Sequence, residues 1–164
     1  MIMTRREIAI NYFKEGYNCS QAVLLAFQDV VGLTKEQCAK LASSFGGGMG
    51  KLREVCGAVS GMFMVAGLLD GYSDPKDADA KAKHYQNIQH LASLFTEQNG
   101  SIICRELLSG NFCKHSDVKQ SGVSAEEISS STPPAKRTDE YYKKRPCADL
   151  VGDAAEILAA YLNL

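Results

Sequence analysis

The sequence predicts an all-α protein: a single-domain helical bundle of about six helices, with a glycine-rich loop and a long polar loop near residues 114–144. Helix starts recur along the chain, and three of them are marked by a capping residue that is followed three positions later by Glu or Gln. Apolar residues repeat at helical spacing, and no segment alternates as a half-buried strand would. A chain of 164 residues is also of ordinary size for one core, so we expect residues 1–164 to form one helical domain.

The first helices are predicted from their caps. Thr4 and Glu7 form a capping box at the start of a helix that should end at Gly16, a residue suited to the left-handed conformation after a helix. Asn18 should cap a second helix, CSQAVLLAFQDVV, which ends near Gly32. A further capping box opens the helix KEQCAKLASSF, and the glycine-rich loop GGGMG follows it.

Residues 54–71, EVCGAVSGMFMVAGLLDG, favour a buried helix at the centre of the bundle. The segment carries no charge between Glu54 and Asp70 and is apolar nearly all round. Gly57 and Gly61 stand four residues apart, a spacing that lets a neighbouring backbone approach closely. Such contact would offset the roughly 1 kcal/mol that each glycine costs in a helix relative to alanine.

The second half of the chain should contain one long and two shorter helices. The long helix is predicted to start at Asp74-Pro75, with Pro75 in its first position, and to end at Asn99-Gly100. Ser101 should cap the short helix IICRELL, and the terminal helix CADLVGDAAEILAAYL should follow Pro146. Within the polar loop, a capping box predicts one helical turn at SAEEI. The inward stripe of the long helix is predicted to be Ala78, Ala82, Tyr85, Ile88, Ala92 and Phe95.

Composition argues against two classes of protein. A net charge of −1 and a pI of about 6.3 give no electrostatic basis for binding nucleic acid. No segment reaches the roughly 18 to 20 apolar residues that a membrane-spanning helix needs, so we expect no membrane span. The N-terminus lacks the features of a secretory signal, and a cytoplasmic location is therefore expected.

Six cysteines are the residues with the most chemistry. In a reducing cytosol a chain of this size does not need static disulfides, which leaves metal ligands, redox-active thiols or buried packing residues. Cys38 falls within a predicted helix and is expected to pack in the core. Cys113, close to His115, is open to either a packing or a functional role. The other four stand near predicted helix starts: Cys19, Cys56, Cys104 and Cys147.

A helix start is a favourable place for a thiolate. Unpaired backbone N–H groups and the positive end of the helix dipole stabilise the negative sulfur there, so we expect these four cysteines to have lowered pKa values. Such thiolates suit either thiol–disulfide exchange or metal coordination. The sequence lacks CxxC, HExxH and CxxCH, which weakens the metal hypothesis, although ligands far apart in the sequence can still converge in a bundle.

The cysteine neighbourhoods occur in a recognisable order along most of the chain: GYNCSQAVLLAF, FGGGMG, CGAVSG, CRELL and CADLV. Together they resemble the redox-active protein family of anaerobic bacteria and archaea that is named for its pattern C…GCAxxG…C…C. The central motif here reads CGAxxG, with the first two residues in the other order. The resemblance implies redox activity, with no settled reaction or substrate. It implies that the residues that matter are Cys19, Cys56, Cys104 and Cys147.

Three functions remain, in order of preference. The first is a thiol redox protein, a thiol-based oxidoreductase that needs no cofactor and exchanges disulfides with a partner protein. We expect Cys19 and Cys56 to be its working pair and Cys104 and Cys147 to be a second or resolving pair, although four cysteines allow three pairings. The second is a site for zinc or an iron–sulfur cluster on the same four cysteines. The third is a non-catalytic helical interaction module. A homo-oligomer is compatible with all three.

Overall fold

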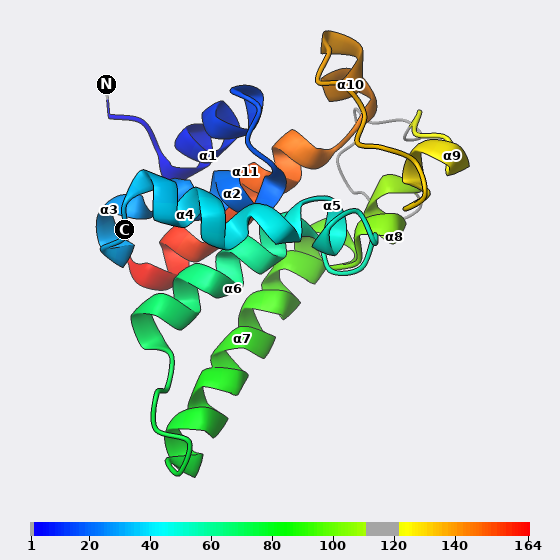
Figure 1. The fold of residues 1–164 in the computed structure, drawn as a ribbon. Coiled ribbons are helices and arrows are strands. Elements are labelled where there is room, and N and C mark those ends of the chain that lie inside the picture. Colours follow the sequence, from blue (N-terminus) through cyan, green and yellow to red (C-terminus); the bar gives the residue numbers. More distant parts are fainter. Residues whose placement is uncertain (1, 111–121) are drawn as a thin grey trace.

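The computed structural model describes residues 2–110 and 122–164 (Figure 1). In these residues the fold is all-α, as predicted, and the isolated antiparallel bridge between Val55 and Ile103 is not part of any strand. The helices of seven or more residues are α1 (Arg5–Lys14), α2 (Cys19–Leu25), α4 (Lys35–Ala42), α6 (Gly57–Asp70), α7 (Ala78–Asn99) and α11 (Cys147–Leu162). The shorter ones are α3 (Gln28–Val31), the 3-10 helix η1 (Ser43–Phe45), α5 (Gly46–Met49), α8 (Cys104–Leu108), α9 (Ala125–Ile128) and α10 (Asp139–Lys144).

Helix α6 lies at the centre, in contact with α2, α7 and α11 (Figure 1). Its glycines allow the close packing that the sequence predicts. A Cβ atom added to Gly61 would lie 2.7 Å from the carbonyl oxygen of Ser20 in α2, and one added to Gly57 would lie 2.9 Å from the carbonyl oxygen of Phe45. Gly67, near the other end of α6, has no such neighbour within 4 Å.

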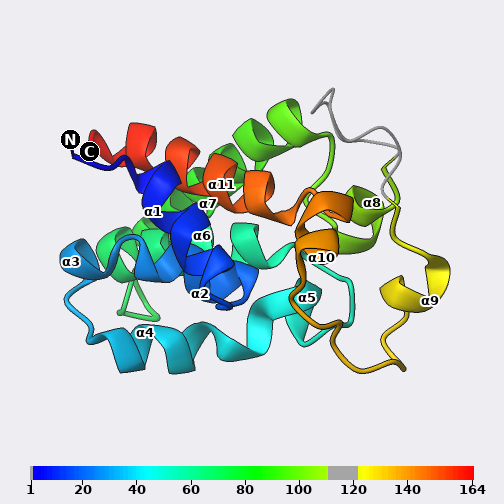
Figure 2. The ribbon, with the colours of Figure 1, turned by 90° about the horizontal axis from the view of Figure 1, so that it is seen from above.

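Helices α1, α2 and α11 complete the core. Figure 2 shows α1 lying across α2 and beside α11, and both pairs are in contact. The side chain of Asp153 in α11 is fully buried, and its Oδ1 accepts a hydrogen bond from Arg6 Nη1 of α1 at 2.5 Å. The predicted capping boxes are present at the starts of α1, α4 and α9, and Asn18 caps α2 as predicted, as part of a further capping box with Gln21. The caps therefore predicted these four helix starts correctly.

The predicted second helix is broken in the structure. Helix α2 ends at Leu25, and α3 begins at Gln28. At the break, Phe27 has a φ of −118° and a ψ of 16°, outside the helical range. The Ala26 carbonyl accepts a hydrogen bond from Arg5 Nη1 at 2.7 Å, so a side chain from α1 satisfies the carbonyl at this break.

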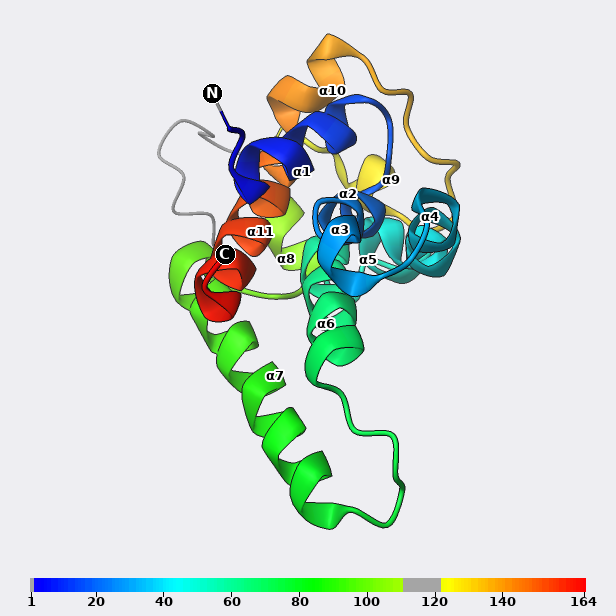
Figure 3. The same cartoon turned by 90° about the vertical axis from the view of Figure 1, so that its left-hand side faces the viewer.

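Helix α7 starts later than predicted and packs over a shorter length. Its N-cap is Asp77, whose side chain accepts from the N–H of Ala80 at 2.9 Å, so the predicted start at Pro75 is wrong. Phe95 is fully buried, but Tyr85 of the predicted stripe is 49% exposed. Figure 3 shows the reason: the first half of α7 projects away from the body of the protein.

Most of the short helices lie at one end of the molecule. Helix α3 and the C-terminal end of α11 lie toward one end, and α5, α8, α9 and α10 lie toward the other (Figures 1 and 2). Helix α10, within the predicted polar loop, was not predicted. Within the described ranges, no helix has the length and apolar character needed to cross a membrane.

Candidate functional site

Four cysteines line one small cavity of about 50 Å³. Cys19, Cys104 and Cys147 are the first residues of α2, α8 and α11, and Cys56 is the N-cap of α6. The structure thus brings together the four cysteines that the sequence places at helix starts. All four are free thiols.

Two glycines make room for these cysteines. Gly48 has a φ of 70°, and a Cβ atom on it would lie 2.6 Å from the Cβ of Cys104. A Cβ atom on Gly57 would lie 3.0 Å from the Cβ of Cys19. Contacts this short are not tolerated in packed interiors. The glycine-rich loop and the CGAxxG segment therefore let four helix starts converge.

A short backbone pairing holds Cys56 and Cys104 as neighbours. The bridge between Val55 and Ile103 is antiparallel, and the N–H of Cys104 donates to the carbonyl of Glu54 at 2.6 Å. In this register Cys56 and Cys104 are diagonal neighbours on the same face, and Cys104 is close enough to raise the pKa of Cys56.

The other two cysteines form a more exposed pair. The side chains of Cys19 and Cys147 lie close enough for Cys19 to raise the pKa of the Cys147 thiol. Both residues are partly exposed, whereas Cys56 is 5% and Cys104 8% exposed. The geometry therefore favours the pairs Cys19–Cys147 and Cys56–Cys104. The pairing of Cys19 with Cys56, expected from the sequence, stays a hypothesis.

The expected lowering of thiol pKa values is wrong for three of the four cysteines. Burial raises the pKa of Cys56 far above its ordinary value, and Cys104 and Cys147 raise it further. Burial also raises the pKa of Cys104, against the opposing effect of Arg53. Hydrogen bonding to Cys19, in which the protonated Cys147 thiol is the donor, raises the pKa of Cys147, and burial raises it further. Loss of water around a charged sulfur outweighs the helix dipole here, so these thiols are protonated at neutral pH.

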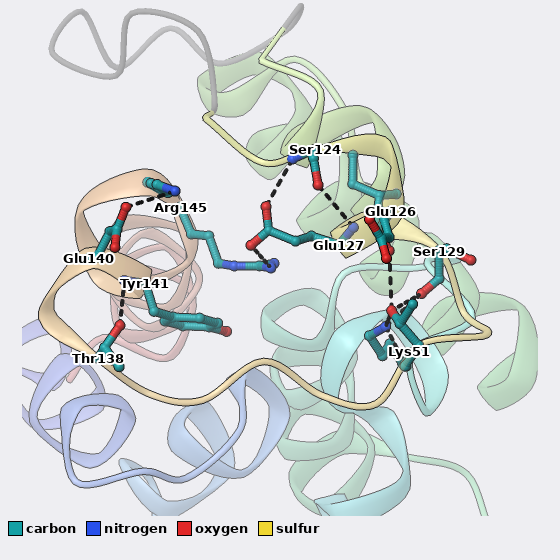
Figure 4. A network of polar contacts seen from close by, with 12 residues as sticks. Lys51, Ser124, Glu126, Glu127, Ser129, Thr138, Glu140, Tyr141 and Arg145 are labelled. Carbon is teal, nitrogen blue, oxygen red and sulfur yellow. Dashed lines mark hydrogen bonds and ion pairs between the residues drawn. The ribbon is translucent and has the colours of Figure 1, made fainter.

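Three arginines also line the cavity: Arg53, Arg137 and Arg145. Arg53 is 8% exposed, and its Nη1 donates to the Sγ of Cys104 at 3.7 Å. The guanidinium of Arg145 lies 4.6 Å from the ring centroid of Tyr141 and 3.7 Å from Glu127 Oε1 (Figure 4). These cations lie beside the sulfurs, so a thiolate that forms there is partly compensated.

Arg137 is held mainly by aromatic rings. Its guanidinium lies 4.3 Å from the ring centroid of Phe13 and 4.8 Å from that of Tyr141, and Nη2 donates to the carbonyl of Tyr17 at 3.2 Å. The Nη1 atom of Arg137 is buried and has no hydrogen-bond partner among the residues that the structure describes. A cation with an unused donor thus stands at the wall of the cysteine cavity.

Residues 123–146, here called the cover segment, close the site from outside. Lys51 Nζ donates to the carbonyls of Ser129 and Thr132 at 2.5 and 2.6 Å (Figure 4). Arg53 Nε donates to the carbonyl of Ile128 at 3.0 Å. Both cations come from the glycine-rich turn, where Lys51 and Arg53 have φ values of 68° and 63°. The turn therefore packs against Cys104 on one side and holds the cover segment on the other.

Sequence reasoning found the cysteines but missed part of their surroundings. Arg53 and Arg145 lie within three residues of Cys56 and Cys147 in the sequence, and both line the cavity. Arg137 and Tyr141 were missed, because they lie in a polar segment without periodicity. Arg105, adjacent to Cys104 in the sequence, instead pairs with Glu54 at 3.0 Å and is half-exposed.

The remaining candidate ligands lie elsewhere. Cys38 is fully buried in α4 and does not line the cavity, whereas Cys113 and His115 lie outside the described residues. Across residues 2–110 and 122–164, no group of three or more His, Cys, Asp or Glu side chains is arranged to hold a metal ion.

Fold and site together define an all-α protein with four thiols around one cavity. A family model matches residues 17–161, and its family is described as "Putative redox-active protein (C_GCAxxG_C_C)". The chain belongs to this family, and the matched range includes all four cavity cysteines. Neither a curated protein nor a solved structure matches the chain.

Proposed function

We propose that this protein carries out thiol–disulfide exchange through its four cavity cysteines, as a cytoplasmic thiol redox protein. The observation that carries the proposal is the convergence of four free thiols on one cavity, with Cys19 and Cys147 as the more exposed two. Membership of a redox-active family supports the same general class. The reaction needs a disulfide-bearing substrate or partner protein, and it needs no cofactor.

Cys19 is the proposed attacking residue because it belongs to the more exposed pair. Its thiolate attacks one sulfur of the incoming disulfide, forms a mixed disulfide and releases the other sulfur as a thiolate that takes up a proton. Cys147 then loses its proton and attacks the Cys19 sulfur. This step forms the Cys19–Cys147 disulfide and releases the second sulfur of the substrate. Two protein thiols are oxidised, and one substrate disulfide is reduced to two thiols.

Cys56 and Cys104 form the proposed inner pair. They are more deeply buried than the outer pair and border the same cavity. By a second exchange the inner thiols reduce the Cys19–Cys147 disulfide and become a disulfide themselves. The fully reduced protein therefore yields four electrons and four protons, in two steps of two.

Counting thiols by intact mass tests the proposal. Protein prepared without oxygen is treated with a mild oxidant, denatured and alkylated, and then compared with an untreated sample. We expect a loss of two or four alkylatable thiols that reduction restores, with peptide mapping showing the Cys19–Cys147 bond first. The control variant Cys38→Ala should lose the same number of thiols as the unaltered protein.

An unchanged thiol count would contradict disulfide chemistry as the function. The Cys147→Ser variant sharpens the result, because it removes the outer pair and should still form the Cys56–Cys104 bond. If the anaerobic protein contains stoichiometric zinc or iron, the four cysteines are metal ligands, and the thiol-exchange proposal fails.

A further inference from the structure

A second cavity of about 400 Å³, here called the vestibule, adjoins the cysteine cavity. The two cavities share part of their walls, so a molecule in the vestibule borders the thiols. A volume of this size is in the range of small-molecule sites. The residues that line both cavities are Asn18, Gly47, Arg53, Arg137, Tyr141 and Arg145.

The vestibule is strongly cationic. Lys51, Arg53, Arg137 and Arg145 line it, and no Asp or Glu is among the described residues of its wall. Lys51 donates to neutral oxygens of Ser129 and Thr132, which leave its charge uncompensated. Burial, together with the charges of Arg53 and Arg145, lowers the pKa of Lys51, which shows that like charges crowd this space. Walls of one charge focus the field and attract ligands of the opposite charge.

The guanidinium of Arg137 has a hydrogen-bond donor that could bind an anion in the vestibule. The Nη1 of Arg137 is buried, lacks a partner among the described residues, and belongs to a side chain that lines both cavities. A buried donor without a partner costs free energy, and an anionic acceptor would remove that cost. Charge-assisted hydrogen bonds from Arg to a carboxylate are also among the strongest in proteins.

From the cationic lining, the volume of the vestibule and the unpartnered Nη1 of Arg137, we infer that the vestibule binds a small organic anion. Arg137 is one of the residues that bind its carboxylate. The inference deepens the proposed function and rests on it in one respect: the anion carries the disulfide that Cys19 attacks. Asn18 and Arg137 line both cavities, so a carboxylate in the vestibule places the attached sulfurs toward the thiols.

Three small disulfides of similar length and different charge test the inference. They are 3,3′-dithiodipropionate with two carboxylates, bis(2-hydroxyethyl) disulfide without charge, and cystamine with two ammonium groups. Each is mixed with fully reduced protein at low ionic strength, and each rate is divided by that of a free neutral thiol. We expect the normalised rate of the dianion to exceed that of the dication by at least about 10-fold, and added salt to shrink the difference. Equal normalised rates, or a faster dication, would overturn the inference.

A pair of variants locates the effect. Arg137→Gln should lower the ratio of the dianion rate to the neutral-disulfide rate at least about threefold, because the effect of its charge on the sulfurs acts on both disulfides and cancels in the ratio. Lys136→Gln makes the same change of charge at the adjacent, exposed residue, which lines neither cavity. It should change none of the rates. An equal effect of both variants would mean that general surface charge, rather than the vestibule, attracts the dianion.

Binding of 3,3′-thiodipropionate distinguishes failure of the redox proposal from failure of the anion site. This dianion has a single sulfur that cannot be reduced, and calorimetry measures its affinity for the unaltered protein. If it binds and no disulfide is reduced, the redox proposal fails while the anion site stands. If all three disulfides are reduced at equal normalised rates and thiodipropionate does not bind, the redox proposal stands and the anion site fails.

Discussion

Cys56 combines two environments that act on its sulfur in opposite directions. As the N-cap of α6 it stands at the positive end of a helix, which favours a thiolate. It is also 95% removed from solvent and lies near two other cysteines, both of which favour the neutral thiol. The second environment prevails. The Cys56 thiol is therefore protonated at neutral pH.

The raised pKa of Cys56 predicts how the stability of the reduced protein depends on pH. An unfolded thiol loses its proton near pH 8.5, whereas the folded thiol keeps it well above that pH. The folded state then binds more protons, so the free energy of unfolding should fall as pH rises above about 8.5, by roughly 1.4 kcal/mol per pH unit for this thiol. Urea unfolding from about pH 7 to about pH 10, with a reductant present, measures the slope.

The Cys56→Ala variant is the control for this slope, since alanine cannot titrate. Its free energy of unfolding should decline less steeply above about pH 8.5 than that of the unaltered protein. Identical slopes in the two proteins would show that Cys56 titrates alike in the folded and unfolded states.

At the scale of elements, the contact between α2 and α6 depends on glycine. Gly61 sits against the backbone of Ser20, with no room for a methyl group, whereas Gly67 of the same helix faces open space. Gly61→Ala should therefore lower the free energy of unfolding by roughly 1 to 3 kcal/mol through overpacking. Gly67→Ala should raise it by up to about 1 kcal/mol, because alanine is the better helix former. Thermal and urea unfolding of both variants measures the difference.

We expect the two substitutions to change the free energy of unfolding in opposite directions. A loss of stability at both positions would mean that the C-terminal half of α6 is also packed closely. A gain at both would mean that the backbone contact between α2 and α6 is looser than the structure has it.

The same scale shows what the sequence could and could not predict. The side chains of Thr4, Asn18 and Thr34 each cap a helix by accepting a hydrogen bond from the backbone N–H three residues later. Local sequence was therefore enough to predict those three helix starts. The break after α2 involves Arg5, and the true start of α7 depends on Asp77 rather than Pro75. Breaks of this kind are set by tertiary contacts or by competition between adjacent caps, neither of which periodicity reveals.

The candidate site was likewise predictable only in part. Its four cysteines could be found because each lies near a predicted helix start, although among these four helices only α2 has a side-chain cap. Its cations could not all be found, because Arg137 reaches the site by packing against Phe13, more than a hundred residues earlier in the chain. The position of a charged side chain in the fold cannot be predicted from a segment without periodicity.

At the scale of the whole molecule, α7 is packed at one end and projects at the other. Phe95 is fully buried against the core, while Tyr85, ten residues earlier, is half-exposed. Phe95→Ala should therefore lower the free energy of unfolding by about 3 to 5 kcal/mol, through lost burial and a cavity. Tyr85→Ala should change it by no more than about 0.5 kcal/mol. Urea unfolding measures both, and a large loss at Tyr85 would mean that the projecting half of α7 is covered in solution.

The attachment of the cover segment has a consequence for how often the thiols meet solvent. Among the described residues, the backbone hydrogen bonds of residues 123–145 join this segment to itself, and the charged side chains of Lys51, Arg53 and Arg137 join it to the body. Each such bond contributes roughly 1.5 to 3 kcal/mol, so we expect the segment to open while the core helices remain intact. We therefore expect reagents to reach the inner cysteines by local opening of this segment, at a rate above that of global unfolding.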